Sequence, residues 1–184
     1  GNKGMYYSLA RSSTPWQCGY DLARKFRKDF CLRNPTKPLA IDKLCGIRRQ
    51  NLPVIRVGEE HQLDAVTTLS DSLGPQVATS KRRESSKGYL LARSLCEYLC
   101  SRTEGSALLT RVSSDRQKRN RAFAAELLAP AEGLRELLSG SRITKDEIAE
   151  TAARLGVSDW LVEHQVQNHR IAEIEGMPPL PASD

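Results

Sequence analysis

The chain has 184 residues, with 28 lysines and arginines against 22 aspartates and glutamates, which gives a formal net charge of +6. A chain of this length can bury a substantial core without disulfide or metal staples, and it is most simply one domain. No apolar run approaches the length that crosses a bilayer, so we expect a cytoplasmic protein that does not bind membranes.

We expect residues 1–13 to be a tag or a flexible N-terminus. The first helix is predicted to begin at Thr14, with Pro15 in its first turn and Gln17 closing a capping box. The apolar residues that follow recur at helical spacing, and we expect all of them in the core: Trp16, Tyr20, Ala23, Phe26 and Phe30.

A short second helix is predicted over residues 39–46, where a glycine ends it. Strands are predicted over 54–57, 63–69 and 76–79, with a Gly-Pro turn at 74–75 between the last two. Short strands enclosed by helices indicate an α+β fold, mostly helical with a small three-stranded sheet.

Two central helices follow the basic, polar segment 80–86. The first contains residues 88–99, Gly-Tyr-Leu-Leu-Ala-Arg-Ser-Leu-Cys-Glu-Tyr-Leu, and the second ends in 121–130, Arg-Ala-Phe-Ala-Ala-Glu-Leu-Leu-Ala-Pro. In the second helix, Ser114 is expected to cap the start, Gln117 to complete a capping box, and Pro130 to stop the helix.

A C-terminal helix pair is predicted over 141–175, resembling a helix-turn-helix. Thr144 and Glu147 form a capping box, Gly156 ends the first helix, and Ser158 caps the second. If the pair read DNA, its second helix would present Asp159, Trp160, Glu163, His164, Gln167 and Asn168. Acidic residues near the start of that helix oppose phosphate contact, so we interpret the pair as packed on the same domain, before a flexible, proline-rich tail at 176–184.

The two central helices resemble the ImmA/IrrE family of metallopeptidase-like domains. Members typically carry Phe-x-x-Ala-His-Glu-Leu-Gly-His-Leu-Leu, followed by Phe-Ala-Ala-Glu-Leu-Leu-x-Pro. The opening helix, with Trp-Gln-x-Gly-Tyr-x-Leu-Ala-Arg, is similar to that of the same group. The resemblance implies a zincin-like fold, with a degenerate metallopeptidase-like domain over 14–140.

The resemblance places the first zinc-binding histidine of the family on Arg93, the catalytic glutamate on Ser94 and the second histidine on Glu97. The third ligand of the family, a carboxylate, falls within 117–120, which reads Gln-Lys-Arg-Asn. Arginine offers no lone pair and serine is no general base at neutral pH. We therefore expect neither metal nor cofactor and no catalytic residue, and we expect Arg93 and Glu97 to form an i,i+4 ion pair.

These replacements favour an inactive, ligand- or protein-binding regulatory domain. The resemblance implies a bacterial stress-response, mobile-element or defence setting, with a protein or peptide partner. The candidate partner-binding cleft consists of Arg93, Ser94, Glu97, Arg116, Lys118 and Arg119.

Two alternatives remain open. The first is an active metallo-endopeptidase with a rearranged zinc site, built from Glu97, Cys96 or Cys100 and a distant histidine. The second is a nucleic-acid-binding module that uses basic helix faces, which contain Lys81, Arg82, Arg83, Arg111, Arg116, Lys118, Arg119 and Arg121. The five cysteines form no Cys-x-x-Cys pair and are odd in number, so reduced thiols are expected.

Overall fold

A computed structural model describes residues 14–56, 62–69, 75–81, 83–101 and 105–177. The predictions for residues 1–13, for the tail from 178 onward and for Gly74 of the expected turn lie outside the described residues. None of the described helices is both long enough and apolar enough to cross a bilayer.

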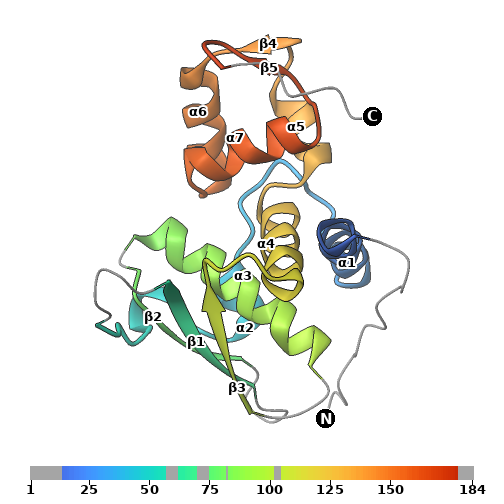
Figure 1. Cartoon of the computed structure of the whole chain (residues 1–184). Helices are drawn as coiled ribbons and strands as arrows, with labels where there is room; N and C mark the ends of the chain where they lie inside the picture. The colour runs from blue at the N-terminus through green and yellow to red at the C-terminus, as the bar shows by residue number, and fades with distance from the viewer. Residues whose placement is uncertain (1–13, 57–61, 70–74, 82, 102–104, 178–184) are drawn as a thin grey trace.

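The described residues form an α+β fold that is mostly helical (Figure 1). Its helices are α1 (Pro15–Asp29), α2 (Ile41–Cys45), the 3-10 turn η1 (Arg49–Asn51), α3 (Glu84–Cys100), α4 (Asp115–Leu128), α5 (Ala131–Leu137), α6 (Lys145–Leu155) and α7 (Asp159–Asn168). Its strands are β1 (Leu63–Leu69), β2 (Gln76–Thr79), β3 (Gly105–Thr110), β4 (Arg142–Ile143) and β5 (Glu173–Ile174).

The three-stranded sheet is antiparallel, in the order β2-β1-β3. A three-stranded sheet was predicted, but one of its strands differs. The prediction of a strand at 54–57 is wrong for its described residues 54–56, because Val54 makes only an isolated bridge to Thr79, and residue 57 lies outside the described residues. The third strand is instead β3, whose Gly-Ser-Ala start lacks the β-branched and aromatic residues that signal a strand.

Helix α1 begins as predicted, with Thr14 and Gln17 forming the capping box. Its apolar stripe is only partly core. Phe26 is buried, whereas Trp16 is 48% exposed and Phe30 is 46% exposed. The prediction was therefore wrong for these two rings, which lie near the two ends of the helix, beyond its central contact with α4.

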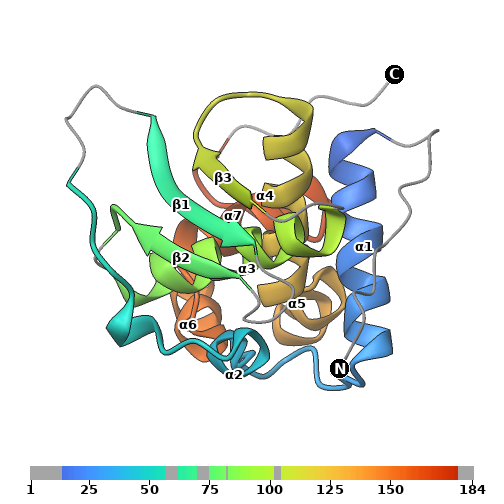
Figure 2. The same cartoon turned by 90° about the horizontal axis from the view of Figure 1, so that it is seen from below.

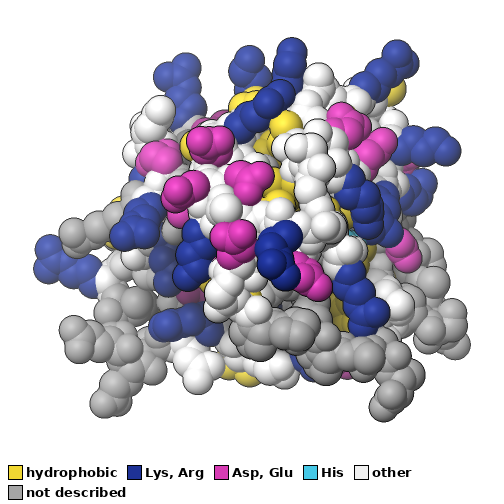
Figure 3. Space-filling view, turned by 90° about the horizontal axis from the view of Figure 1, so that it is seen from above, with side chains coloured by type: hydrophobic (Ala, Val, Ile, Leu, Met, Phe, Trp, Pro, Cys, Tyr) yellow, Lys and Arg dark blue, Asp and Glu magenta, His cyan; other side chains and the backbone are white. Residues whose placement is uncertain are grey.

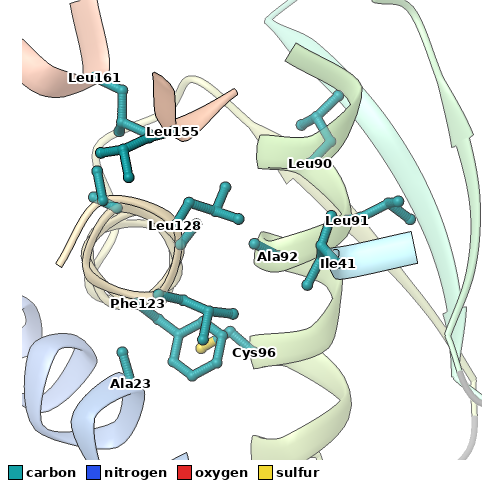
Figure 4. Close-up of a cluster of buried hydrophobic side chains, with 14 of the residues drawn as sticks. Ala23, Ile41, Leu90, Leu91, Ala92, Cys96, Phe123, Leu128, Leu155 and Leu161 are labelled. Atoms are coloured by element: carbon teal, nitrogen blue, oxygen red, sulfur yellow. The ribbon is translucent and has the colours of Figure 1, made fainter. Parts of the chain in front are cut away.

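The core is layered around α3 and α4. Seen from below, the sheet, α3, α4 and α1 follow one another (Figure 2). Within this stack, Phe123 of α4 lies next to Cys96 of α3 and close to Ala23 of α1 (Figure 4). The C-terminal half of α4 is consequently surrounded by protein, and all of its residues from Ala122 to Leu128 are buried.

The predicted C-terminal helix pair is present as α6 and α7. The capping box at Thr144, the left-handed Gly156 and the Ser158 cap all form as expected. Helix α7 contacts α4 and α5, and Leu155 and Leu161 of the pair reach toward Leu128 of α4 (Figure 4). The pair therefore shares the core of the rest of the chain.

Candidate functional site

Arg93 lies in the middle of α3 and is the centre of a buried polar network. Its side chain is nearly inaccessible, at 2% exposed. One terminal nitrogen, Nη1, donates to Oδ2 of Asp64 at 3.0 Å, and the other, Nη2, donates to Oε1 of Gln117 at 2.6 Å and to the carbonyl of Thr110 at 2.8 Å. A single guanidinium thus joins β1, β3, α3 and α4.

Glu97 lies one turn farther along α3 and also bonds across to α4. Its Oε1 accepts a hydrogen bond from Nδ2 of Asn120, and Nε of Arg116 lies 3.6 Å from the same oxygen. The predicted ion pair between Arg93 and Glu97 is therefore wrong. Both side chains are buried, and each obtains a partner from a neighbouring element instead of from its own helix.

Gln117 also departs from its predicted role. Ser114 does cap α4, because its Oγ accepts from the backbone N–H of Gln117 at 3.3 Å. The Gln117 amide does not complete a capping box. It turns inward, where it accepts from Arg93 and donates from Nε2 to the carbonyl of Leu108 at 2.9 Å. A charged hydrogen bond in the interior outweighs the cap in this position.

The four positions therefore form two contacting pairs, 93 with 117 and 97 with 120. The donors at these positions are a guanidinium, a carboxylate and two amides, and this set does not fit zinc. Across the described ranges, no three His, Cys, Asp or Glu side chains gather closely enough to hold a metal ion. The rearranged zinc site is not assembled there, and His61 lies outside the described residues.

Ser94 and the two cysteines of α3 are packing residues in this arrangement. Ser94 is fully buried. Burial raises the pKa of the Cys96 thiol well above its ordinary value. The hydrogen bond with Cys96 lowers the pKa of Cys100, and the nearby positive charge of Arg119 acts in the same direction. The two thiols are joined by a hydrogen bond and are not oxidised to a disulfide. Among the described residues, no third metal-binding side chain lies with them.

A cavity of about 620 Å³ opens beside this network, between α1, α3, α4 and α7. This volume is within the range of small-molecule sites. Five cationic side chains line it, namely Lys81, Arg93, Arg111, Lys118 and Arg121. The aromatic rings and imidazole that line it are Trp16, Tyr20, Tyr89, Trp160 and His164.

Asp64 is the acidic residue that lines the cavity, and it faces three of the cations. Its Oδ1 lies 3.0 Å from Nζ of Lys81 and 3.8 Å from Nε of Arg111, while its Oδ2 accepts from Arg93. Among these four described side chains, one carboxylate faces three positive charges. With Lys118 and Arg121, the cavity lining is strongly electropositive.

The structure brings together part of the predicted cleft. Arg93 and Lys118 line the cavity, whereas Ser94, Glu97, Arg116 and Arg119 do not. Arg116 bonds to the carbonyl of Leu108 at 3.3 Å and pairs with Glu97, and Arg119 donates to Asn120 Oδ1.

Sequence reasoning missed Asp64, Tyr89 and the placement of Trp160 in the cavity wall. Asp64 had one local signal, since it is the only charged residue of the strand segment Leu-Asp-Ala-Val-Thr-Thr-Leu. Trp160 was considered only as a DNA-reading residue, and nothing in its neighbourhood along the chain indicates that it faces Tyr89 of α3, at a centroid distance of 6.5 Å.

The face formed by β4, β5 and α6 carries mixed charges. Viewed from above, acidic side chains gather in the middle of this face, with lysines and arginines mostly around them (Figure 3). The described residues of the helix pair therefore form no continuous basic surface on this side, which argues against a phosphate-backbone contact there.

No model of a known protein family matches the chain, and the comparison with curated proteins finds no match either.

Proposed function

We propose that the chain is a catalytically inactive domain of the ImmA/IrrE peptidase type, with a zincin-like arrangement of its central helices. In this proposal it acts as a regulatory module that binds a ligand or a protein partner, in a bacterial stress-response, mobile-element or defence setting. The cytoplasmic location expected from the sequence belongs to the same proposal.

One observation carries the proposal. The resemblance puts two zinc ligands on α3 and the third near the start of α4, and ligands of one metal ion must meet in space. Gln117 Oε1 lies 2.6 Å from Arg93, and Asn120 bonds to Glu97. These contacts support the proposal, because the positions that would hold the zinc ligands meet in this chain. Arginine, glutamate and amides occupy them, and Ser94 stands at the position of the general base.

Metal content and proteolysis test the loss of catalysis. Protein purified without a chelator should contain far less than one zinc per chain by plasma mass spectrometry, and it should leave casein intact. Ser94→Ala should change neither result. One zinc per chain, together with casein cleavage that is lost in Glu97→Gln, would contradict the proposal, since Glu97 is the carboxylate that a rearranged site would use.

Restoring the ligands tests the placement of the two helices. The triple variant Arg93→His, Glu97→His and Asn120→Asp is expected to bind one zinc ion, because two histidines at i and i+4 share one helix face and position 120 already contacts position 97. Zinc should raise the melting temperature of the triple variant. The matched control, Arg93→His alone, has too few donors and should not respond. A folded triple variant that takes up no zinc would contradict the zincin-like part of the proposal.

A further inference from the structure

The cavity has an aromatic wall that can stack on a planar ring. This wall consists of Trp16, Tyr20, Tyr89, Trp160 and His164. Trp160 and His164 lie one turn apart on α7 with their ring centroids 4.1 Å apart, and Tyr89 approaches Trp160 edge-on. Trp160 is 52% exposed and Trp16, which lines the cavity from α1, is 48% exposed. Half-exposed tryptophans beside a cavity provide stacking surfaces, and aromatic stacking on a nucleobase contributes about 1–3 kcal/mol.

The cationic side chains that line the cavity form a basic wall, which suits an anion with more than one negative charge. Lys81, Arg93 and Arg111 surround the single carboxylate of Asp64, within 4 Å at most. Arg121 of α4 bonds only weakly to loop carbonyls, with Nη1 3.4 Å from the carbonyls of Arg111 and Val112. Arginine and lysine together are the side chains that bind phosphate groups.

Two helix starts add to this positive field. Ser85 and Ser86 of the first turn of α3 and Ser158, the cap of α7, also line the cavity. The N-terminal ends of helices carry partial positive charge and free N–H groups. Glu84 and Asp159 in the first turns of these helices offset part of this field, so the cationic side chains carry the larger share of the positive charge.

Extended ligands fit these observations less well. An acidic peptide would use the cations but would leave the aromatic wall without a partner. A polynucleotide needs a basic groove that follows its backbone, whereas the five cationic side chains named above line a cavity of about 620 Å³. A small molecule that joins a planar base to phosphates uses both walls.

We propose that the cavity between α1, α3, α4 and α7 binds a nucleoside phosphate, with the base against Trp160 and the phosphates against the cations near Asp64. This inference rests on the proposed function, because it names the ligand of the inactive domain.

Tryptophan fluorescence tests the inference directly. The chain has only two tryptophans, and both line the cavity. ATP should quench this fluorescence saturably when it is excited at the red edge of the tryptophan band, where nucleotides do not absorb. Adenosine and inorganic tripolyphosphate should each bind at least about tenfold more weakly, since each lacks one of the two contacts.

Variants locate the binding. Lys118→Gln with Arg121→Gln should weaken ATP binding by about tenfold or more. The matched control, Lys145→Gln with Arg154→Gln, makes the same charge change on exposed positions of α6 and should leave ATP affinity unchanged. Trp160→Ala, followed through Trp16, should weaken ATP binding and leave tripolyphosphate binding unaltered.

Several outcomes would overturn the inference. These are the absence of saturable quenching by ATP, equal affinity for ATP and adenosine, equal affinity for ATP and tripolyphosphate, and equal ATP affinity in the Lys118/Arg121 variant and its control. Tighter binding of oligo(dT) than of ATP would indicate a polynucleotide site instead. Binding of a poly-glutamate peptide without ATP binding would overturn the inference but leave the proposed function intact, which is tested separately by zinc content and casein cleavage.

Discussion

At the scale of single residues, Arg93 is the unusual feature of this chain. A guanidinium loses its hydration when it is buried, and only good partners compensate for that cost. Arg93 has three of them, a carboxylate, an amide oxygen and a backbone carbonyl, each from a different element. In this position arginine cross-links α3, α4 and the sheet, a structural role that a metal ion has in zinc-binding domains.

We predict that Arg93→Leu lowers the free energy of unfolding by about 3–5 kcal/mol, because it leaves Asp64 and Gln117 buried without the guanidinium that bonds to both. Urea denaturation measures this change. The control is Arg142→Leu, whose 3.5 Å pair with Glu173 is 68% exposed on both sides and should cost less than about 1 kcal/mol. Similar losses in the two variants would show that the Arg93 network contributes nothing beyond a surface pair.

At the scale of elements, α4 is the helix on which the others are assembled. Its Glu126 bonds to Arg24 of α1 at 3.0 Å and to Gln165 of α7 at 3.1 Å, and it lies 3.2 Å from Nε2 of His169. On its α1 side, α4 approaches Gly19 closely. Glu126 of α4 and Gly19 of α1 therefore determine how α1, α4 and α7 pack together.

We predict that Glu126→Gln destabilises the fold by about 1–3 kcal/mol near neutral pH, because it weakens the contacts of a buried carboxylate with three side chains. Burial raises the pKa of Glu126, but the hydrogen bond with His169 and the charge of Arg24 outweigh burial and leave the pKa lowered. A carboxylate whose pKa is lower in the folded state contributes stability above its unfolded value and loses it as the pH falls.

The difference in unfolding free energy between the wild type and Glu126→Gln should therefore shrink as the pH falls below about 4.5, the ordinary value for this group. Urea denaturation at a series of pH values measures it. Glu136→Gln, at an exposed position of α5, serves as the control and should show a difference near zero. A difference that grows on acidification would contradict the assignment.

We predict that Gly19→Ala is destabilising by about 1–3 kcal/mol, as overpacking usually is. A Cβ at position 19 would lie 2.4 Å from the carbonyl oxygen of Arg119 and 2.8 Å from Cβ of Ala122. Helix propensity alone would make the change stabilising by about 1 kcal/mol. Thermal unfolding decides the sign, with Ala153→Gly on the exposed side of α6 as the control for propensity alone, and a more stable Gly19→Ala variant would mean that α1 and α4 lie farther apart.

At the scale of the whole molecule, the C-terminal helix pair and the central helices form one packed unit. Gln165 of α7 donates to Glu126 and to the carbonyl of Ala129 at 2.9 Å. Leu161 and Val166 of α7 belong to the same hydrophobic core as Phe123 of α4. An unfolding event in α7 would expose the core side of α4, so the two parts should unfold together.

We predict a single unfolding transition, since the two parts share one core. Trp16→Phe leaves Trp160 as the reporter of α7, and Trp160→Phe leaves Trp16 as the reporter of α1. In each variant, the fluorescence midpoint in urea should match the midpoint from far-ultraviolet circular dichroism of the same protein. A fluorescence midpoint from Trp160 well below the circular dichroism midpoint would show that the helix pair is an independent unit.

The sequence alone determined the α+β class and the starts of α1, α4, α6 and α7. It also showed that the side chains of Arg93 and Ser94 are not zinc ligands. Caps at Thr14, Ser114 and Thr144 formed because a cap depends on residues three positions apart. Whether a side chain has a lone pair that can bind a metal ion is likewise decided by the residue type alone.

Only the tertiary structure decided which partners the buried polar residues have. Arg93 bonds to Asp64, 29 positions away, instead of to Glu97 on its own helix. The side chain of Gln117 bonds to Arg93 instead of completing the capping box of α4. Trp16 and Trp160 line one cavity although they are far apart in the sequence. A buried charge takes the partner that packing brings to it, and packing depends on segments that are distant in the sequence.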